Sequence, residues 1–492
     1  MEKVAIKAPF QAVPKLNCAA YLSQYSDVTV KLPDCPELVQ CLAITIKARY
    51  PWVSINIILL FIIVKIAQAI TAKRIKYKEF ENVKFPNIFA TVLMGSGFGK
   101  DKIINDLDTS VFTEFRNWCY EEFKKFKNRK ANETNQETKG SEQQELREMV
   151  LEITDGTKEG LTSDAELFSQ VGIGSLFIEN SEFWSFLANS TLDQKQLYYQ
   201  FYHAYDSKII SKCTQGKPRK RNIEDVPVNL LLSSDPSLFE CNLKEAFNTD
   251  LKTGFIRRLL LGYQAVKEPY AIETDARKSR LAKDKYGVNL KILGEHFFEI
   301  FKKIELNAIY TLTNEAYDEV LFPYTKRLEK LENEEETPLL AIEIPSRELK
   351  VIRLSAIYAC LNHPCEFVIL PKDVRQAIDT VEMISIDLCK FLKIEQNLES
   401  NCESLLEFFI AHQGKEFTTT DLKQNYFSNS GLSKREFNKN FKALIESISL
   451  MATSRGYILN ETPAGNSGAK YALIPIKSEA LSDGIQQLED LI

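Results

Sequence analysis

An apolar run that leads directly into three closely spaced glycines constrains this chain more than any other feature. Residues 87–94 read NIFATVLM, a short β-branched and aromatic run that predicts a buried strand. Gly95, Gly97 and Gly99 follow at alternate positions, and helical periodicity then begins at Lys102. Glycines allow the tight turn in which successive backbone N–H groups point at phosphate oxygens. The order of strand, glycine turn and helix therefore predicts a phosphate-binding P-loop.

The loop departs from the P-loop consensus at both of its ends. That consensus is Gly, four residues, then Gly-Lys-Ser/Thr. Here Met94 takes the first glycine position and Asp101 takes the hydroxyl position. Lys100 is expected to reach the β- and γ-phosphates and Asp101 to help hold Mg²⁺, while a glycine turn that binds nothing is the alternative. The residues expected to bind ATP are Gly95, Ser96, Gly97, Phe98, Gly99, Lys100 and Asp101.

A second apolar run, Gly174–Ile178, ends in a cluster of polar residues. An ATPase needs one carboxylate near its metal ion and another to orient the attacking water. Glu179 and Asn180 hold these paired positions in one register, and Ser181 and Glu182 hold them in the other. We favour Glu182 as the water-positioning base and Glu179 as the metal-side carboxylate. The alternative is that both are solvated acids at the end of a strand.

Two further segments carry polar groups expected at the same site. The apolar strand Val228–Leu232 has a polar tip, where Ser234 is expected to sense the γ-phosphate or the attacking water. Arg257 and Arg258 follow in an apolar frame, and adjacent residues of a helix do not share a face. An arginine suits the charge that develops at a γ-phosphate, because its own charge is fixed and its donors form a planar fork. We expect Arg258 to act across a subunit boundary, with ordinary salt bridges inside one subunit as the alternative.

Taken in order, these segments resemble a family of uncharacterised phage, plasmid and mobile-element proteins of primase-helicase type, which have a RecA/AAA+-like P-loop ATPase core. The resemblance covers about residues 10–395. After the glycine loop it rests on Asp155–Leu161, Ser181-Glu182-Phe183, Gly254 with Arg258, and Arg353–Ala359. It implies an ATP-dependent DNA helicase or translocase that acts in replication of a phage or mobile genetic element. A homo-hexameric ring is the expected working form, because a closed head-to-tail interface brings Arg258 to the neighbouring nucleotide.

A basic segment lies between the acidic strand and the polar-tipped strand. Residues 208–225 predict a polar hairpin whose tip contains a Gly and a Pro. Cations clustered at such a tip suit the backbone phosphates of DNA, while a solvated hairpin is the alternative. The cations expected to contact DNA are Lys212, Lys217, Arg219, Lys220 and Arg221.

Residues 401–476 predict a winged helix. Its helices are expected at Glu403–His412, Thr420–Tyr426 and Ser433–Leu450, and its wing strands at Tyr457–Asn460 and Lys470–Ile476. The third helix of such a domain commonly enters the major groove, although winged helices also bind proteins. The residues of this helix expected to contact DNA are Lys434, Arg435 and Lys439.

Chain length, net charge and the order of predicted strands and helices limit the number of domains and the fold class. At 492 residues the chain is expected to hold two or three domains, and its alternating strands and helices predict the α/β class. A net charge of −5 excludes a wholly basic nucleic-acid coat but not a local basic groove. The expected divisions are a docking segment 1–50, a P-loop ATPase core 51–270 with a charged insertion 124–148, a helical domain 271–395, a winged-helix domain 396–480 and an acidic tail 481–492.

The cysteines and the apolar segments indicate in which cellular compartment the protein is expected. The 10 cysteines include no Cys-x-x-Cys pair, which indicates a reduced, cytoplasmic chain. Cys360, His363 and Cys365 lack a second ligand pair, so we expect no metal site there. The N-terminus lacks the pattern of a secretory signal. Trp52–Ile70 is strongly apolar but is interrupted by Lys65 among others, and it predicts a buried core helix, with a membrane helix as the alternative.

Three functions stay open on the sequence alone. The first is the ATP-dependent DNA helicase or translocase, with single-stranded or forked DNA and other replication proteins as partners. The second is a non-hydrolysing initiator or loader in which the degenerate loop binds nucleotide as a switch. The third is a DNA-binding regulator in which the winged helix is the primary element. ATP hydrolysis stimulated by single-stranded DNA separates the first function from the other two.

Overall fold

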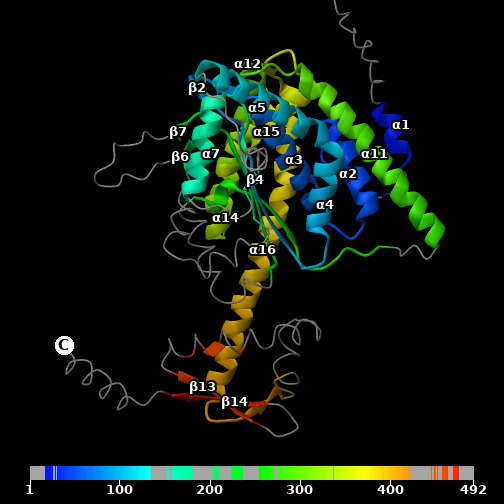
Figure 1. The fold of residues 1–492 in the computed structure, drawn as a ribbon. Helices are drawn as coiled ribbons and strands as arrows, with labels where there is room; N and C mark the ends of the chain where they lie inside the picture. The colour runs from blue at the N-terminus through cyan, green and yellow to red at the C-terminus, as the bar shows by residue number, and fades with distance from the viewer. Residues whose placement is uncertain are drawn as a thin grey trace, which may run out of the picture. The chain divides into compact units, whose positions relative to one another are not determined.

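The computed structural model describes most of the chain between residues 17 and 475 (Figure 1). The described residues are 17–25, 28, 30–134, 152–153, 158–180, 203–209, 223–236, 254–270, 275–335, 337–419, 421–422, 445, 448–449, 452, 457–463 and 469–475. The chain forms two compact units, Met1–Cys389 and Lys390–Ile492, and the division falls inside the long helix α16 (Pro371–Ala411).

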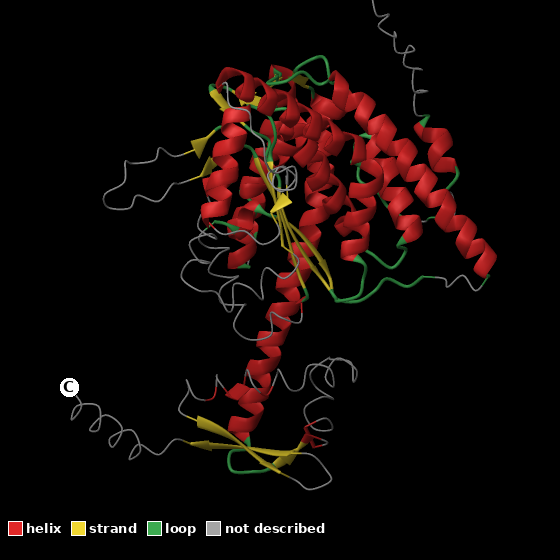
Figure 2. Cartoon of the chain, in the orientation of Figure 1, coloured by secondary structure: helices red, strands yellow, loops and turns green. Residues whose placement is uncertain are grey.

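A five-stranded sheet runs through the first unit, and its strands are all parallel. The strand order is β4-β5-β8-β3-β9. The bounds are β3 Phe89–Met94, β4 Glu152–Ile153, β5 Leu176–Asn180, β8 Val228–Ser234 and β9 Leu260–Gln264. β3 and β8 are buried along their whole length, as expected of continuous apolar strands in a parallel sheet. Helices lie on either side of these strands in Figure 2, and the predicted α/β class is confirmed.

The parallel arrangement brings the carboxyl ends of the strands to one edge of the sheet. Leu93 near the end of β3 pairs with Ser234 on β8 and with Tyr263 on β9. The glycine segment follows β3 at this edge and leads into helix α4 (Lys100–Asp106). In open α/β sheets, ligands bind outside the carboxyl ends of the strands. The glycine segment and the ends of β5 and β8, which were predicted to share one site, therefore meet at the edge where a site is expected.

The most apolar helix, α3 (Ile55–Ala72), lies in the core of this unit and packs on β3, β8 and β9. It is long and apolar enough to cross a membrane, but all of its residues are buried inside the protein. Its single charged side chain, Lys65, is buried with the rest. The prediction of a buried core helix is confirmed.

The other helices of the unit surround the sheet and α3. Helix α2 (Glu37–Arg49) packs on both α3 and α11 (Ala276–Lys303), so part of the segment expected to dock belongs to the core. The remaining helices are α1 Cys18–Ser23, α5 Thr113–Thr134, α7 Lys158–Val171, α12 Asn314–Ala316, α13 Phe322–Glu334, α14 Pro338–Glu343 and α15 Ser346–Asn362. Single helical turns occupy Leu107–Val111, Ile256–Arg258 and Tyr317–Leu321.

A second, smaller sheet joins the region that was expected to be purely helical to the start of the core. Its order is β11-β10-β1-β2. The strands are β1 Lys76–Glu79, β2 Asn82–Lys84, β10 Ile309–Leu312 and β11 Val368–Ile369. β10 pairs in parallel with β1, more than 200 residues earlier in the chain, so no unit boundary separates the two regions.

The second unit has its own small core and an antiparallel sheet. The sheet order is β12-β14-β13, with β12 Phe417–Thr418, β13 Tyr457–Pro463 and β14 Ala469–Pro475. Leu405, Leu406 and Phe409 from the last turns of α16 pack with Tyr471 and Leu473 of β14. The two segments predicted as wing strands pair with each other in antiparallel register.

Candidate nucleotide-binding site

The glycine loop adopts backbone conformations that its glycines make possible. Gly97 and Gly99 have φ of +76° and +103°, where a side chain is strained. A Cβ atom on Gly95 would lie 2.7 Å from the ring of Phe98. Gly99 immediately precedes α4, and Lys100 is the first residue of that helix, which runs on into the turn Leu107–Val111. The backbone of the loop therefore requires Gly97 and Gly99, whereas a side chain at Gly95 would displace the Phe98 ring.

One backbone N–H of the loop already meets an anionic oxygen. The N–H of Ser96 donates to Oδ2 of Asp235 at 2.7 Å. Asp235 directly follows β8, so a residue 139 positions away in sequence closes over the loop. This N–H thus donates to an anionic oxygen, and a phosphate bound at the same position would displace the Asp235 carboxylate.

Ser234, at the end of β8, is a candidate side-chain donor beside the loop. It is fully buried, and its register partner on β3 is Leu93, two residues before Gly95. Within the described part of the chain, its Oγ has no hydrogen-bond partner. A buried polar atom without a partner costs free energy, so a ligand that accepts this hydrogen bond is favoured.

Aromatic side chains form a wall along one side of the loop. The indole N–H of Trp52 donates to the carbonyl of Phe98 at 2.8 Å, and the Trp52 and Tyr270 ring centroids are 5.0 Å apart. The ammonium of Lys267 lies 5.6 Å from the Trp52 ring and 5.4 Å from the Phe98 ring. The wall was missed from the sequence, because its residues come from three segments that only the fold brings together.

The acidic strand end is described as far as Asn180, where β5 stops. Glu179 lies at this end, and its Oε2 is 3.4 Å from the ammonium of Lys65 on α3. Lys65 also pairs with Asp108 at 3.0 Å. Glu179 and Asn180, the pair of the first register, are the last described residues of this strand, whereas Ser181 and the favoured Glu182 lie outside the described residues.

The residues predicted to hold Mg²⁺ do not form a ready-made metal site. Asp101 is exposed in the first turn of α4, whereas the carboxylate of Glu179 is engaged by an ammonium group. In the described part of the chain, no cluster of three or more His, Cys, Asp or Glu side chains is placed to hold a metal ion. The described residues therefore offer no preformed magnesium site, and the magnesium assignment of Asp101 and Glu179 stays a prediction.

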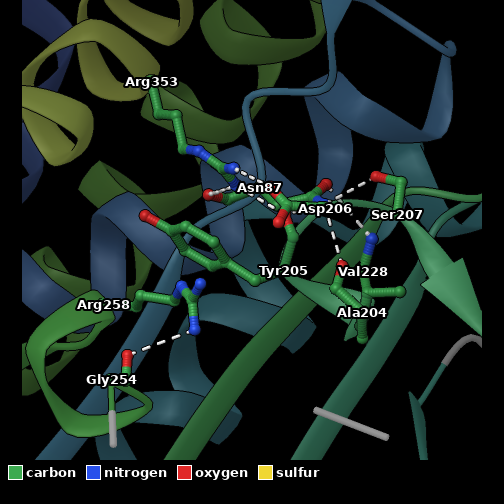
Figure 3. Close-up of polar contacts among 9 residues, drawn as sticks. All are labelled: Asn87, Ala204, Tyr205, Asp206, Ser207, Val228, Gly254, Arg258 and Arg353. Carbon is green, nitrogen blue, oxygen red and sulfur yellow. Dashed lines mark hydrogen bonds and ion pairs between the residues drawn. The ribbon is translucent and has the colours of Figure 1, made fainter. Parts of the chain in front are cut away.

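Arg258 lies at the opposite edge of the sheet from the glycine loop. It ends the turn before β9, and β9 then runs roughly 13 Å, at about 3.3 Å per residue, before reaching the loop edge. Its guanidinium donates to the carbonyl of Gly254 at 3.3 Å and lies 5.6 Å from the centroid of the Tyr205 ring. Figure 3 shows the Tyr205 ring between Arg258 and Arg353. Within one subunit, Arg258 does not reach the loop.

The predicted basic hairpin is described only at its stem. β6 (Lys208–Ile209) and β7 (Ile223–Glu224) form an antiparallel pair. Asn87 holds the base of the stem, because its side chain bonds to the carbonyls of Ala204 and Tyr205 and to the hydroxyl of Ser207 (Figure 3). The predicted DNA contacts Lys212, Lys217, Arg219, Lys220, Arg221, Lys434, Arg435 and Lys439 lie outside the described residues.

His363 belongs to a structural cluster. Its Nε2 lies 2.7 Å from Oδ2 of Asp373, a fully buried carboxylate that also accepts from the N–H of Leu370 before α16. Burial alone lowers the pKa of His363, but the hydrogen bond and negative charge of Asp373 outweigh it and raise that pKa above 6.5. Asp373 thus caps α16 and holds His363 at the same time.

No protein-family model matches this chain, and no curated protein matches it. The chemistry of the site is therefore what bears on function.

Proposed function

We propose that this chain is a P-loop ATPase of the RecA/AAA+ kind that drives a DNA helicase or translocase in the cytoplasm, in replication of a phage or mobile genetic element. The observation that carries the proposal is the position of the glycine loop. It follows β3 at the carboxyl edge of a parallel sheet, with the polar end of β8 on one side and β9 on the other.

Several groups around the loop support ATP as its ligand. The N–H of Ser96 meets an anionic oxygen, Lys100 opens the helix that follows, and Ser234 has a hydroxyl to donate. These are the kinds of group that hold phosphate. The aromatic wall of Trp52 and Tyr270 offers a face on which a base stacks. Asp101 is the side chain that would hold a magnesium ion bound to those phosphates.

Two features support DNA as the partner. The antiparallel order β12-β14-β13 next to the last turns of α16 is compatible with a winged helix. The stem formed by β6 and β7 supports a hairpin that carries five cations beyond it. A ring of subunits would gather these hairpin tips along a central channel.

The decisive measurement is steady-state ATP hydrolysis with and without single-stranded DNA. A motor requires turnover that rises when DNA is added and that is lost in Lys100→Ala. Absence of nucleotide binding by the folded wild-type protein would refute the proposal. Binding without turnover selects the second candidate.

That second candidate is a nucleotide-switched initiator or loader that does not hydrolyse ATP. It is favoured by the described end of β5, where Glu179 is paired with Lys65 and the next residue is the neutral Asn180. A water-orienting carboxylate must then come from Glu182. If Glu182→Gln leaves DNA-stimulated turnover intact, another residue orients the attacking water, and the register that places Glu182 there is wrong.

A further inference from the structure

We infer that the ammonium group of Lys65 is the counter-ion of the Glu179 carboxylate. Glu179 is therefore neutralised by the protein itself and is not a magnesium ligand. The inference deepens the proposed function, on which it rests only for the assignment of β5 as the acidic strand of a nucleotide site. The ion pair itself stands on geometry alone.

The geometry places Lys65 between two carboxylates from different elements. Its Nζ lies 3.0 Å from Oδ2 of Asp108 and 3.4 Å from Oε2 of Glu179, and its side chain is 1% exposed. It also lies 4.3 Å from the centroid of the Phe177 ring, two residues before Glu179 on the same strand. The ammonium therefore covers the face of β5 from which Glu179 projects.

The position of Lys65 in the fold makes this contact hard to break. Lys65 is the only charged residue of α3, and α3 is buried throughout. A buried ammonium is tolerated only when it is paired, and loss of one partner from a buried pair is strongly destabilising. Because the helix cannot turn this side chain to solvent, the ammonium stays beside Glu179 when ligands arrive.

A divalent metal ion on Glu179 would have to compete with that ammonium. Mg²⁺ binds oxygen at about 2.1 Å, so an ion on Oε2 would face a fixed positive charge a few ångströms away. Like charges at such separations repel strongly away from bulk water. Asp108, in the turn that follows α4, is held by the same ammonium and by Arg116 at 3.4 Å. Two cations, Lys65 and Arg116, thus lie against Glu179 and Asp108 before any metal binds.

The first test uses Mn²⁺ as the probe on the full-length protein without nucleotide, with the free ion measured by electron paramagnetic resonance. Lys65→Met should gain a Mn²⁺ site at Glu179 and Asp108, with at least tenfold tighter binding than wild type. Glu179→Gln added to Lys65→Met should remove this gain. Lys65→Arg, which keeps the charge, should behave as wild type.

Lys47→Met is the matched control. Lys47 is also a buried lysine, with a side chain that is 8% exposed, and it pairs with Glu268 away from β5. It should gain no Mn²⁺ site. A folded Lys65→Met that gains none either would overturn the inference. So would a wild-type Mn²⁺ site that Glu179→Gln abolishes, and this outcome can be scored even if Lys65→Met fails to fold.

The second test asks how nucleotide binding depends on magnesium. The Mg²⁺ concentration for half-maximal binding of a fluorescent ATP analogue should differ less than twofold between wild type and Glu179→Gln. A tenfold rise in Glu179→Gln would make Glu179 a magnesium ligand and overturn the inference. If no analogue binds at any Mg²⁺ concentration, the proposed function fails, while the Mn²⁺ experiment still decides the role of Lys65.

Discussion

The guanidinium carbon of Arg353 lies 3.6 Å from the centroid of the Tyr205 ring, and Arg353 also donates to the carbonyl of that residue at 2.7 Å. Arg353 is fully buried on α15, whereas Tyr205 stands just before the stem of the basic hairpin. Arg258 is the second cation near the same ring, at 5.6 Å. One aromatic ring thus links a core helix, the hairpin stem and the arginine expected to act between subunits.

Arg258→Ala should abolish ATP hydrolysis while leaving nucleotide binding intact, because the loop of the same subunit lies at the far edge of the sheet. Mixing this variant with Lys100→Ala should restore some ATPase activity that neither parent has, since each supplies what the other lacks. The measurement is turnover in mixtures whose co-assembly is proven by a tag on one partner. No recovery despite mixing, or full activity in a monomer, rules out action across a boundary.

Lys100→Ala should weaken ATP binding on the order of 10- to 100-fold, the worth of a charge-assisted hydrogen bond. The measurement is titration with a fluorescent ATP analogue. Lys102→Ala is the matched control, because Lys102 lies exposed on the same helix and should bind as wild type. Equal affinity in the two variants would defeat the assignment of the glycine loop as a phosphate site.

Glu182→Gln should keep ATP binding and reduce turnover on the order of 100- to 10,000-fold. The substitution removes the general base but keeps the size and shape of the side chain. Single-turnover hydrolysis measures this separately from binding. Glu179→Gln is the comparison. If it stops turnover while Glu182→Gln is silent, the first register at the end of β5 carries the chemistry.

Neutralising Lys217, Arg219, Lys220 and Arg221 together should weaken binding to all DNA sequences alike. For single-stranded DNA, the slope of log K against log salt should become shallower by about 3, at about 0.7 per phosphate contact. Fluorescence anisotropy across a salt series measures both effects. Neutralising three exposed cations of α13, namely Lys326, Arg327 and Lys330, is the control. If the salt slope is unchanged in the hairpin variant, the hairpin is a solvated loop that does not contact DNA.

His363 should make stability depend on pH. Its pKa in the folded protein is raised above 6.5, so the protonated form favours folding. The stabilisation is complete below about pH 6.5, the unfolded value, and is lost as pH rises through the folded-state pKa. The free energy of unfolding in urea should therefore exceed that of His363→Gln by more at pH 6 than at pH 9. A difference that is the same at both values would contradict the coupling to Asp373.

The local order of strand, loop and helix could be predicted from the sequence because neighbouring residues determine it. β3 and α4 lie within two residues of their expected starts. The contacts of Lys65 could not be predicted in this way. Its carboxylate partners lie 43 and 114 residues away, and the sequence showed only a lysine that interrupts an apolar run. Because a buried lysine needs a carboxylate partner, the sequence indicates that such a partner exists, but it does not indicate which residue supplies it.

The four-stranded sheet β11-β10-β1-β2 could not be predicted either, because its strands come from distant parts of the chain. β10 and β11 are short and lie among helices, so their composition is a weak signal. Their pairing partner, β1, precedes the glycine loop. Only the closed fold brings these segments together, and that is why residues 271–395 were expected to be helical throughout.

The burial of α3 has a consequence for synthesis of the chain. The ribosome completes this helix at Ala72, but β9, which helps to cover it, ends only at Gln264. At 5–20 residues per second, the interval is roughly 10 to 40 seconds. During that time the nascent chain presents a segment with the length and character of a membrane anchor. A pathway that inserts apolar helices into membranes therefore has time to act on α3 before the sheet that buries it is complete.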